Sequence, residues 1–150
     1  MPLYFAYGSN MNKEQMHERC SSALLLGVAS LIDYRLAFTI YSPTRACGCA
    51  DIVPTPDAAV FGLLYEMTEE DMSALDTFEG HPEHYRRTTI TVRDTNMQEH
   101  TVFSYDVVTK QEGLLPSRHY LGLITDAAKE YGFPEQYQTT LREFGTTHPD

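Results

Sequence analysis

The sequence predicts an α+β protein with a strongly bent, mostly antiparallel or mixed sheet. Short runs of apolar, β-branched and aromatic residues, which are typical of strands, fill most of the first two thirds of the chain, with few helical segments between them. Two segments with helical periodicity then follow one another in the last third. Strands first and helices last are typical of α+β folds, whereas a doubly wound sheet needs helices that alternate with strands.

The first half of the chain is expected to hold mainly strands. Residues 3–7 are apolar and predict a short buried strand that runs into a turn at Gly8. A short polar helix is expected over residues 12–19, with Asn10 or Asn12 as its N-cap. The other strands are expected at residues 24–30, 34–41, 49–53 and 59–67, beside or within a loop-like segment, 42–56, marked by Pro43, Gly48, Pro54 and Pro56.

Helix caps and turn residues divide the second half. Thr68 and the three acidic residues after it predict a helix that runs to about Phe78 and stops at Gly80. Two alternating strands, 86–93 and 101–108, are expected to pair across a polar turn near residues 94–98. Two helices are expected at the end of the chain. The first is expected after Ser117 and should end at Gly132, with Tyr120, Ile124, Ala127 and Tyr131 on one face. The second is expected to begin with Pro134 at N1 and to end at Gly145, with Tyr137, Leu141 and Phe144 on one stripe.

Length and composition favour a single globular domain over residues 1–150. Hydrophobic residues make up 42% and charged residues 21%, and no apolar run approaches the roughly 20 residues of a membrane span. A net charge of −10 disfavours nucleic acid and anionic membranes as partners. Three cysteines, an odd number, and an N-terminus without a basic leader favour the reducing cytoplasm over secretion. We therefore expect a cytoplasmic protein that binds a small molecule or another protein.

The turn Tyr7-Gly8-Ser9-Asn10 directly follows the first strand. Gly8 can take a positive φ or allow a close backbone approach, and Ser9 and Asn10 add polar side chains. If a helix starts at once, its unpaired N–H groups suit an anionic group such as a carboxylate. An ordinary turn capped by Asn10 is the alternative, and the Gly-Lys-Ser/Thr element of a phosphate loop is missing.

Glu79 is the candidate acid or base. Leu75 and Phe78 are expected to bury one side of the helix end beside it. Loss of solvation and the negative end of the helix dipole both raise the pKa of a carboxyl group toward neutrality, as a base working near pH 7 requires. The alternative is a solvated surface glutamate, since most glutamates lie at protein surfaces.

Metal and thiol chemistry are less favoured. His81 and His84 are separated by Pro82 and do not share one helix face, so a structural or surface role is expected for them. Cys47 and Cys49 lack both a second cysteine pair and a histidine partner that can be placed, so no metal and no cofactor are expected. Tyrosines on ordered elements are usually core or rim residues, but a pocket can use their hydroxyl groups to hold a carboxylate; those in question are Tyr85, Tyr105 and Tyr120.

Taken together and in order, these features resemble the γ-glutamylcyclotransferase family. Residues 5–10, Phe-Ala-Tyr-Gly-Ser-Asn, resemble the family's YGSN signature. Residues 75–80, followed by 85–87, resemble its second signature, whose glutamate is catalytic. Residues 116–137 are similar to the C-terminal part of the cytosolic γ-glutamylcyclotransferases. The resemblance covers about residues 3–144.

The resemblance implies a small mixed β-barrel with surrounding helices, often dimeric, so a homodimer is expected. It also implies an enzyme without cofactor that releases 5-oxoproline and an amino acid or amine from γ-glutamyl amides, because the substrate's own α-amine attacks its γ-carbonyl. Glu79 would act as general base and acid. The residues implied around the substrate are Tyr7, Gly8, Ser9 and Asn10 at the glutamyl α-carboxylate end, with Tyr85, Tyr105 and Tyr120 around the pocket.

One departure from the family pattern concerns the pocket wall. Relatives tend to have a glycine pair before an Ala-x-Ile element, and this chain has Cys49 at one of the two positions. The choice of substrate therefore stays open between γ-glutamyl amino acids and γ-glutamylamines. A non-catalytic ligand-binding protein with the same fold is a further alternative.

Overall fold

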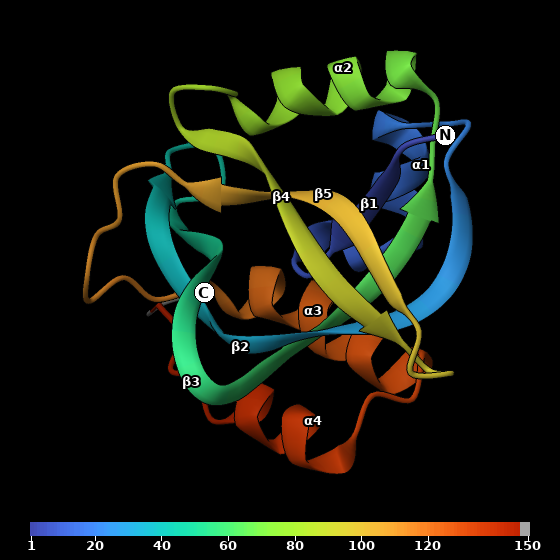
Figure 1. Ribbon diagram of the computed structural model, residues 1–150. Coiled ribbons are helices and arrows are strands. Elements are labelled where there is room, and N and C mark those ends of the chain that lie inside the picture. The colour runs from blue at the N-terminus through green and yellow to red at the C-terminus, as the bar shows by residue number, and fades with distance from the viewer. Residues whose placement is uncertain (148–150) are drawn as a thin grey trace.

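A closed, five-stranded barrel with the strand order β1-β3-β2-β4-β5 forms the centre of the protein (Figure 1). The computed structural model describes residues 1–147. The strands are β1 (Leu3–Ala6), β2 (Leu24–Ser42), β3 (Cys47–Glu66), β4 (Tyr85–Asp94) and β5 (Glu99–Val107). The helices are the 3-10 turn η1 (Ser9–Met11), α1 (Lys13–Arg19), α2 (Glu69–Glu79), α3 (Arg118–Glu130) and α4 (Glu135–Arg142).

Mixed strand pairing closes the barrel. Four of the five neighbouring strand pairs are antiparallel, whereas β1 and β5 run parallel and meet at Tyr4 and Phe103. The expected α+β class and the small mixed β-barrel with surrounding helices are therefore confirmed.

The long pair β2–β3 is where the strand prediction is wrong. Instead of separate strands at 24–30 and 34–41 and a loop-like segment at 42–56, two strands of 19 and 20 residues pair from Leu24–Glu66 to Ser42–Cys47. The pair bends where Asp33 and Asp57 both have φ 68°, and the N–H group of Asp57 donates to Oδ1 of Asp33 over 3.0 Å. Pro56 lies within this irregularity, where no ladder hydrogen bond is required of it.

Side-chain caps begin three of the helices. The side chains of Asn12, Thr68 and Ser117 each accept a hydrogen bond from the backbone N–H group three residues further on. Asn12, and not Asn10, is therefore the cap of α1. Pro134 occupies the N-cap position of α4 instead of N1, and that helix ends at Arg142, three residues before Gly145.

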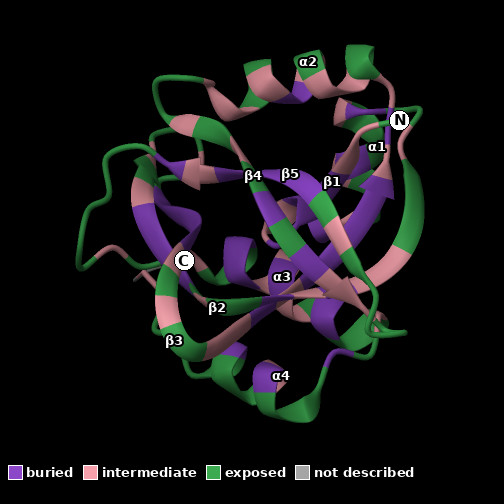
Figure 2. Cartoon of the chain, in the orientation of Figure 1, coloured by how far each residue is buried: buried purple, intermediate pink, exposed green. Residues whose placement is uncertain are grey.

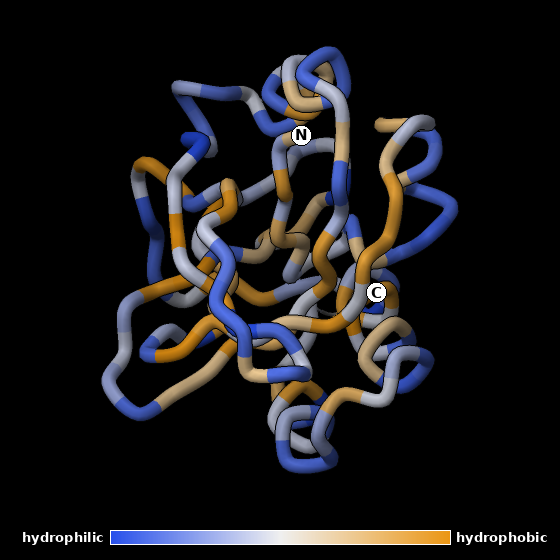
Figure 3. Tube along the Cα trace, turned by 45° about the vertical axis from the view of Figure 1, so that its right-hand side comes forward, coloured by the Kyte–Doolittle hydropathy of each residue, from blue (hydrophilic) through white to orange (hydrophobic). Residues whose placement is uncertain are grey.

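Buried side chains fill the barrel and the space between it and α3. Figure 2 shows β1 and the barrel-facing stripe of α3 as buried, while the outer faces of α2 and α4 are largely exposed. Hydrophobic stretches run through the interior, and hydrophilic ones gather at the turns and the outer helices (Figure 3). Helix α2 crosses one end of the barrel, and α3 and α4 pack at the other side (Figure 1). Among residues 1–147, no helix is long and apolar enough to span a membrane.

Candidate active site

A pocket of about 430 Å³ opens where the end of β1, η1, the β2–β3 turn and the C-terminal end of α2 meet. These segments are far apart in the sequence, and the closed barrel brings them together. All eight residues expected at the site lie in the wall of this pocket: Tyr7, Gly8, Ser9, Asn10, Glu79, Tyr85, Tyr105 and Tyr120.

Gly8 allows the first loop to pass close to β3. Its φ is −114°, so a positive φ is not the reason for glycine here. A Cβ atom at this position would lie 3.2 Å from Cβ of Ala50, which is tighter than ordinary packing. Turn η1 follows at once, and its first hydrogen bond runs from the N–H group of Met11 to the carbonyl of Gly8. The N–H groups of Ser9 and Asn10 thus have no acceptor within the turn.

Asn10 is buried and connects the loop to Glu79. Its Nδ2 group donates to the hydroxyl of Tyr4 over 3.0 Å and lies 3.5 Å from Oε1 of Glu79. Its Oδ1 atom accepts from Gln15 and Arg19 over 2.9 and 3.1 Å. Because both ends of the amide are engaged, the donor that faces Glu79 is fixed in direction.

Glu79 is the last residue of α2 and faces this asparagine from the pocket wall. Burial raises the pKa of its carboxyl group to about 7, although the positive charges of Arg19 and Arg45 act in the opposite direction. Gly80, with φ 68°, then turns the chain away from the helix. A group that titrates near neutral pH can both accept and donate a proton under physiological conditions.

Phe78 corrects one part of the prediction for this helix end. Leu75 is fully buried as expected, but Phe78 is 56% exposed instead of buried. The guanidinium group of Arg19 lies over the Phe78 ring, 5.1 Å from its centroid. The pocket wall around Glu79 therefore combines the end of α2 with residues of β1, η1, α1 and the β2–β3 turn.

The pocket tyrosines bond mainly to the protein itself. The hydroxyl of Tyr7 donates to the carbonyl of Tyr105 over 2.6 Å, and that of Tyr105 donates to Asp76 over 2.6 Å. Tyr85 donates to the carbonyl of Ala50, while the hydroxyl of Tyr120 accepts from the N–H group of the same residue. Three of the four hydroxyl protons are thus already used within the protein, and these bonds hold β3, β5 and the pocket wall together.

Three polar residues that sequence reasoning did not select complete the site. Arg19 and Arg45 line the pocket. Gln15 links Arg45 to the loop, because its amide donates to Ser9 and Asn10 and accepts from Arg45 over 2.7 Å, whereas Arg19 donates to Asn10 directly. Arg19 and Gln15 look like ordinary residues of a polar helix, and Arg45 lies in a segment read as a loop. No local pattern marks them, since only the fold places them side by side.

The cysteines and histidines among residues 1–147 form no metal or thiol site. All three cysteines are buried and free, and burial raises the pKa of the Cys49 thiol at the pocket wall to about 11. His84 lines the pocket, whereas Nδ1 of His81 accepts from the N–H group of Arg87 over 2.9 Å. Within residues 1–147, no three His, Cys, Asp or Glu side chains are grouped so that they could hold a metal ion.

The fold and the pocket define a small α+β barrel protein with a carboxyl group of near-neutral pKa in a pocket that also contains two arginines. Residues 59–141 match the AIG2-like family. The chain is 38% identical to γ-glutamylcyclotransferase of Bos taurus over 144 residues, which cover 93% of this chain and 76% of that protein. It is 36% identical to γ-glutamylcyclotransferase of Homo sapiens, over 93% of this chain and 77% of that protein.

A solved structure described as a γ-glutamyl cyclotransferase has the same fold, with a TM-score of 0.91 and 33% sequence identity. The alignment covers 97% of this chain and 89% of the solved one. The chain therefore belongs to the AIG2-like family.

Proposed function

We propose that this chain is a γ-glutamylcyclotransferase that releases 5-oxoproline and an amino acid or amine from γ-glutamyl amides. The α-amine nitrogen of the substrate attacks its own γ-carbonyl carbon, a ring C–N bond forms, and the original amide C–N bond breaks. Protons given up by the attacking nitrogen end on the departing nitrogen, so neither water nor a co-reactant is consumed. An intramolecular attack of this kind gains most of its rate from correct folding of the substrate.

Glu79 is the observation that carries this proposal. The reaction needs a group that takes a proton from the attacking amine and delivers one to the leaving amine. A carboxyl group with a pKa of about 7 at the pocket wall, 3.5 Å from an amide donor that is held in place, suits both steps. Identity of 36–38% to γ-glutamylcyclotransferases over most of the chain supports the same activity.

The loop from Tyr7 to Asn10 is proposed to hold the glutamyl half. The N–H groups of Ser9 and Asn10 precede the first hydrogen bond of η1, so they can donate to a carboxylate or to the oxyanion that develops during attack. The tyrosines would then shape the pocket around the folded substrate. A cytoplasmic location and a homodimer stay predictions.

The test is a panel of γ-glutamyl amino acids and γ-glutamylamines, scored by chromatography for 5-oxoproline. Glu79→Gln keeps the size of the side chain but cannot move a proton, so we expect at least a roughly hundredfold loss of kcat. Turnover of Glu79→Gln close to that of the wild type would remove Glu79 from the mechanism. Binding of the panel without any release of 5-oxoproline would instead indicate a non-catalytic binding protein.

A further inference from the structure

Asp76 has two side-chain partners, and both of them donate hydrogen bonds to it. Oδ1 of Asp76 accepts from the hydroxyl of Tyr105 over 2.6 Å, and Oδ2 accepts from Nη1 of Arg87 over 2.9 Å. Arg87 and Tyr105 lie directly opposite each other on β4 and β5, and their side chains meet Asp76 where α2 crosses the end of the barrel (Figure 1). A carboxylate satisfies both donors because it only accepts, whereas an amide of the same size accepts at one end and donates at the other.

The bond to Asp76 makes the Tyr105 hydroxyl an acceptor at the pocket wall. Tyr105 lines the pocket and is buried, and its single hydroxyl proton is directed at Asp76. Burial, the bond to Asp76 and, to a smaller extent, the charge of Glu79 raise the pKa of Tyr105 well above its ordinary value, so the hydroxyl keeps this proton at neutral pH. The lone pairs of its oxygen can therefore only accept a hydrogen bond from a ligand in the pocket.

The same hydroxyl lies on the side of the pocket that Glu79 occupies. Asp76 precedes Glu79 by three residues on α2, so the two carboxyl groups share one face of the helix, about 4.5 Å apart along its axis. The ring of Tyr105 packs edge-on against that of Tyr4, with 6.0 Å between the centroids. The hydroxyl of Tyr4 in turn accepts from the Asn10 amide, which lies 3.5 Å from Glu79. An amine that reaches Glu79 therefore also comes near the hydroxyl oxygen of Tyr105.

We infer that Asp76 is a positioning residue, which orients the hydroxyl of Tyr105 so that its oxygen accepts a hydrogen bond from the α-ammonium group of the substrate. The inference rests on the proposed function, which brings the α-amine of the substrate to Glu79. An ammonium group has three N–H donors, so one can reach Glu79 while another reaches Tyr105. With an amide at position 76, the charged Arg87 would hold the amide oxygen, the amide nitrogen would face Tyr105, and the hydroxyl proton would point at the ammonium group instead.

The first experiment measures kcat/KM for the release of 5-oxoproline from γ-glutamyl-alanine. Asp76→Asn keeps the size of the side chain and should lower kcat/KM by about tenfold to a hundredfold, the usual range for a hydrogen bond to a charged group. Tyr105→Phe removes the hydroxyl and should cause a similar loss. The double variant should lose no more than Tyr105→Phe alone, because Asp76 acts through that hydroxyl. A merely structural or electrostatic role of Asp76 makes the two losses add, and that result would overturn the inference.

A second substitution should compensate for the first. In Asp76→Asn/Arg87→Leu no guanidinium group competes for the amide oxygen, so that oxygen can accept from Tyr105 again, and kcat/KM should approach that of Arg87→Leu alone. A double variant with the full loss of Asp76→Asn would contradict the assigned orientation of the hydroxyl. Asp106→Asn is the matched control, because Asp106 follows Tyr105 on β5 but pairs with Arg86 and does not line the pocket, and it should leave kcat/KM unchanged.

Binding of unreactive ligands tests the contact with the ammonium group without turnover. Glutamate and glutarate differ only in the α-ammonium group, and neither has a γ-amide bond to cleave. By calorimetry, glutamate should bind the wild type more tightly than glutarate, and the ratio of the two Kd values should fall by about tenfold in Asp76→Asn and in Tyr105→Phe. A wild type that binds glutamate no more tightly than glutarate, or a ratio that the variants leave unchanged, would overturn the inference.

The failure of the inference and that of the proposed function are distinguishable. Wild-type release of 5-oxoproline together with unchanged kcat/KM in Asp76→Asn would remove Asp76 from the site and leave the proposed function standing. Absence of 5-oxoproline in the wild type would overturn the proposed function and this inference together.

Discussion

At the scale of single residues, the electrostatic state of Glu79 depends on opposing effects. Burial raises the pKa of its carboxyl group, and the nearby charges of Arg19 and Arg45 lower it, with burial the larger. The outcome, a pKa of about 7, lies well above the ordinary value of 4.5. Holding such a carboxylate in its ionised form at high pH costs folding free energy, because the unfolded chain would solvate it fully.

The stability of the protein should therefore depend on pH through Glu79. Between the unfolded pKa of 4.5 and the folded pKa of about 7, the folded state binds more protons than the unfolded state, so stability falls as pH rises through this window. Glu79→Gln removes this dependence. We expect the free energy of unfolding of Glu79→Gln to rise relative to that of wild type by roughly 2 to 3 kcal/mol between pH 4.5 and pH 8, so that the variant gains relative stability.

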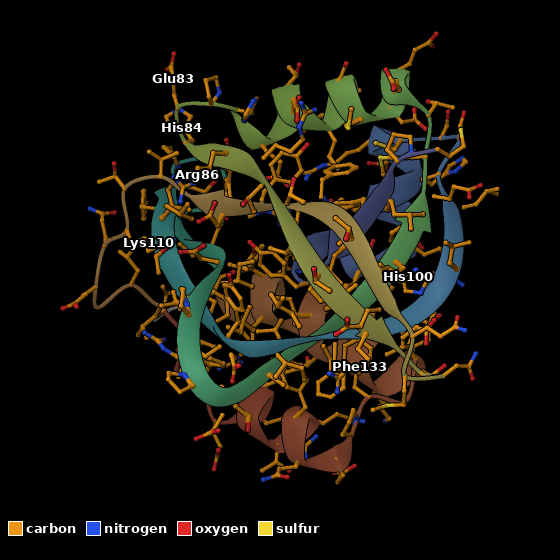
Figure 4. The ribbon with its side chains drawn as sticks, viewed as in Figure 1. Glu83, His84, Arg86, His100, Lys110 and Phe133 are labelled. Atoms are coloured by element: carbon orange, nitrogen blue, oxygen red, sulfur yellow. The ribbon has the colours of Figure 1, made fainter. Side chains whose placement is uncertain are left out.

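Urea unfolding at the two pH values measures this difference. Glu83→Gln is the matched control, because Glu83 is exposed and points away from the protein in the loop after α2 (Figure 4). If the free energies of unfolding of Glu79→Gln and wild type differed by the same amount at both pH values, this would contradict a pKa of Glu79 raised by burial.

At the scale of elements, the end of α2 sets the position of the candidate base. Gly80 and Gly132 both end helices with a left-handed conformation, at φ 68° and 67°. Their surroundings differ, because a Cβ atom on Gly80 would lie 2.7 Å from the ring of His84, whereas one on Gly132 would meet nothing within 4 Å. Alanine substitutions at the two glycines therefore distinguish the cost of backbone strain from the cost of a steric contact.

Gly132→Ala is expected to cost about 1 kcal/mol of stability through backbone strain alone and to keep full activity. Gly80→Ala should cost more, about 2 kcal/mol or above, since the methyl group must also displace His84. It should also lower kcat by about tenfold or more, because Glu79 directly precedes it and small displacements of a catalytic group are costly. Thermal unfolding and 5-oxoproline release measure the two effects. Equal behaviour of both variants would show that the contact with His84 does not hold Glu79 in place.

At the scale of the whole molecule, Asp51 joins elements that are distant in sequence. It is fully buried in β3 and accepts from Thr39 of β2, from its neighbour Ile52, from the N–H group of Val107 in β5, and from Lys110 over 2.7 Å. Figure 4 shows Lys110 in the segment that follows β5, beside β3. These bonds join β2 and β3, near the turn that carries Arg45, to the end of β5 and the segment after it.

Asp51→Ala is expected to lower the free energy of unfolding by about 3 to 5 kcal/mol, because it leaves several buried donors without their acceptor. Arg86→Ala breaks the ion pair with Asp106, in which the arginine side chain is 60% exposed, and should leave the unfolding midpoint nearly unchanged. Chemical denaturation of both variants makes the comparison. A loss at Asp51 no larger than that at Arg86 would refute the structural role of this buried carboxylate.

Local sequence determined the features of this protein that depend on near neighbours. Caps such as Thr68 and Ser117, the stop at Gly80 and the α+β order of elements could be read from it, because caps and periodicity act within a few residues. The family resemblance also pointed to Glu79 and the Tyr7 to Asn10 loop, which lie in one pocket. Only the tertiary structure joined the predicted fragments into the bent β2–β3 pair, since register and bulges depend on partners far along the chain. The tertiary structure likewise placed Arg19 and Arg45 in one pocket with Glu79, and Gln15 in contact with Asn10 and Arg45, because these contacts join residues that no local sequence pattern relates to Glu79.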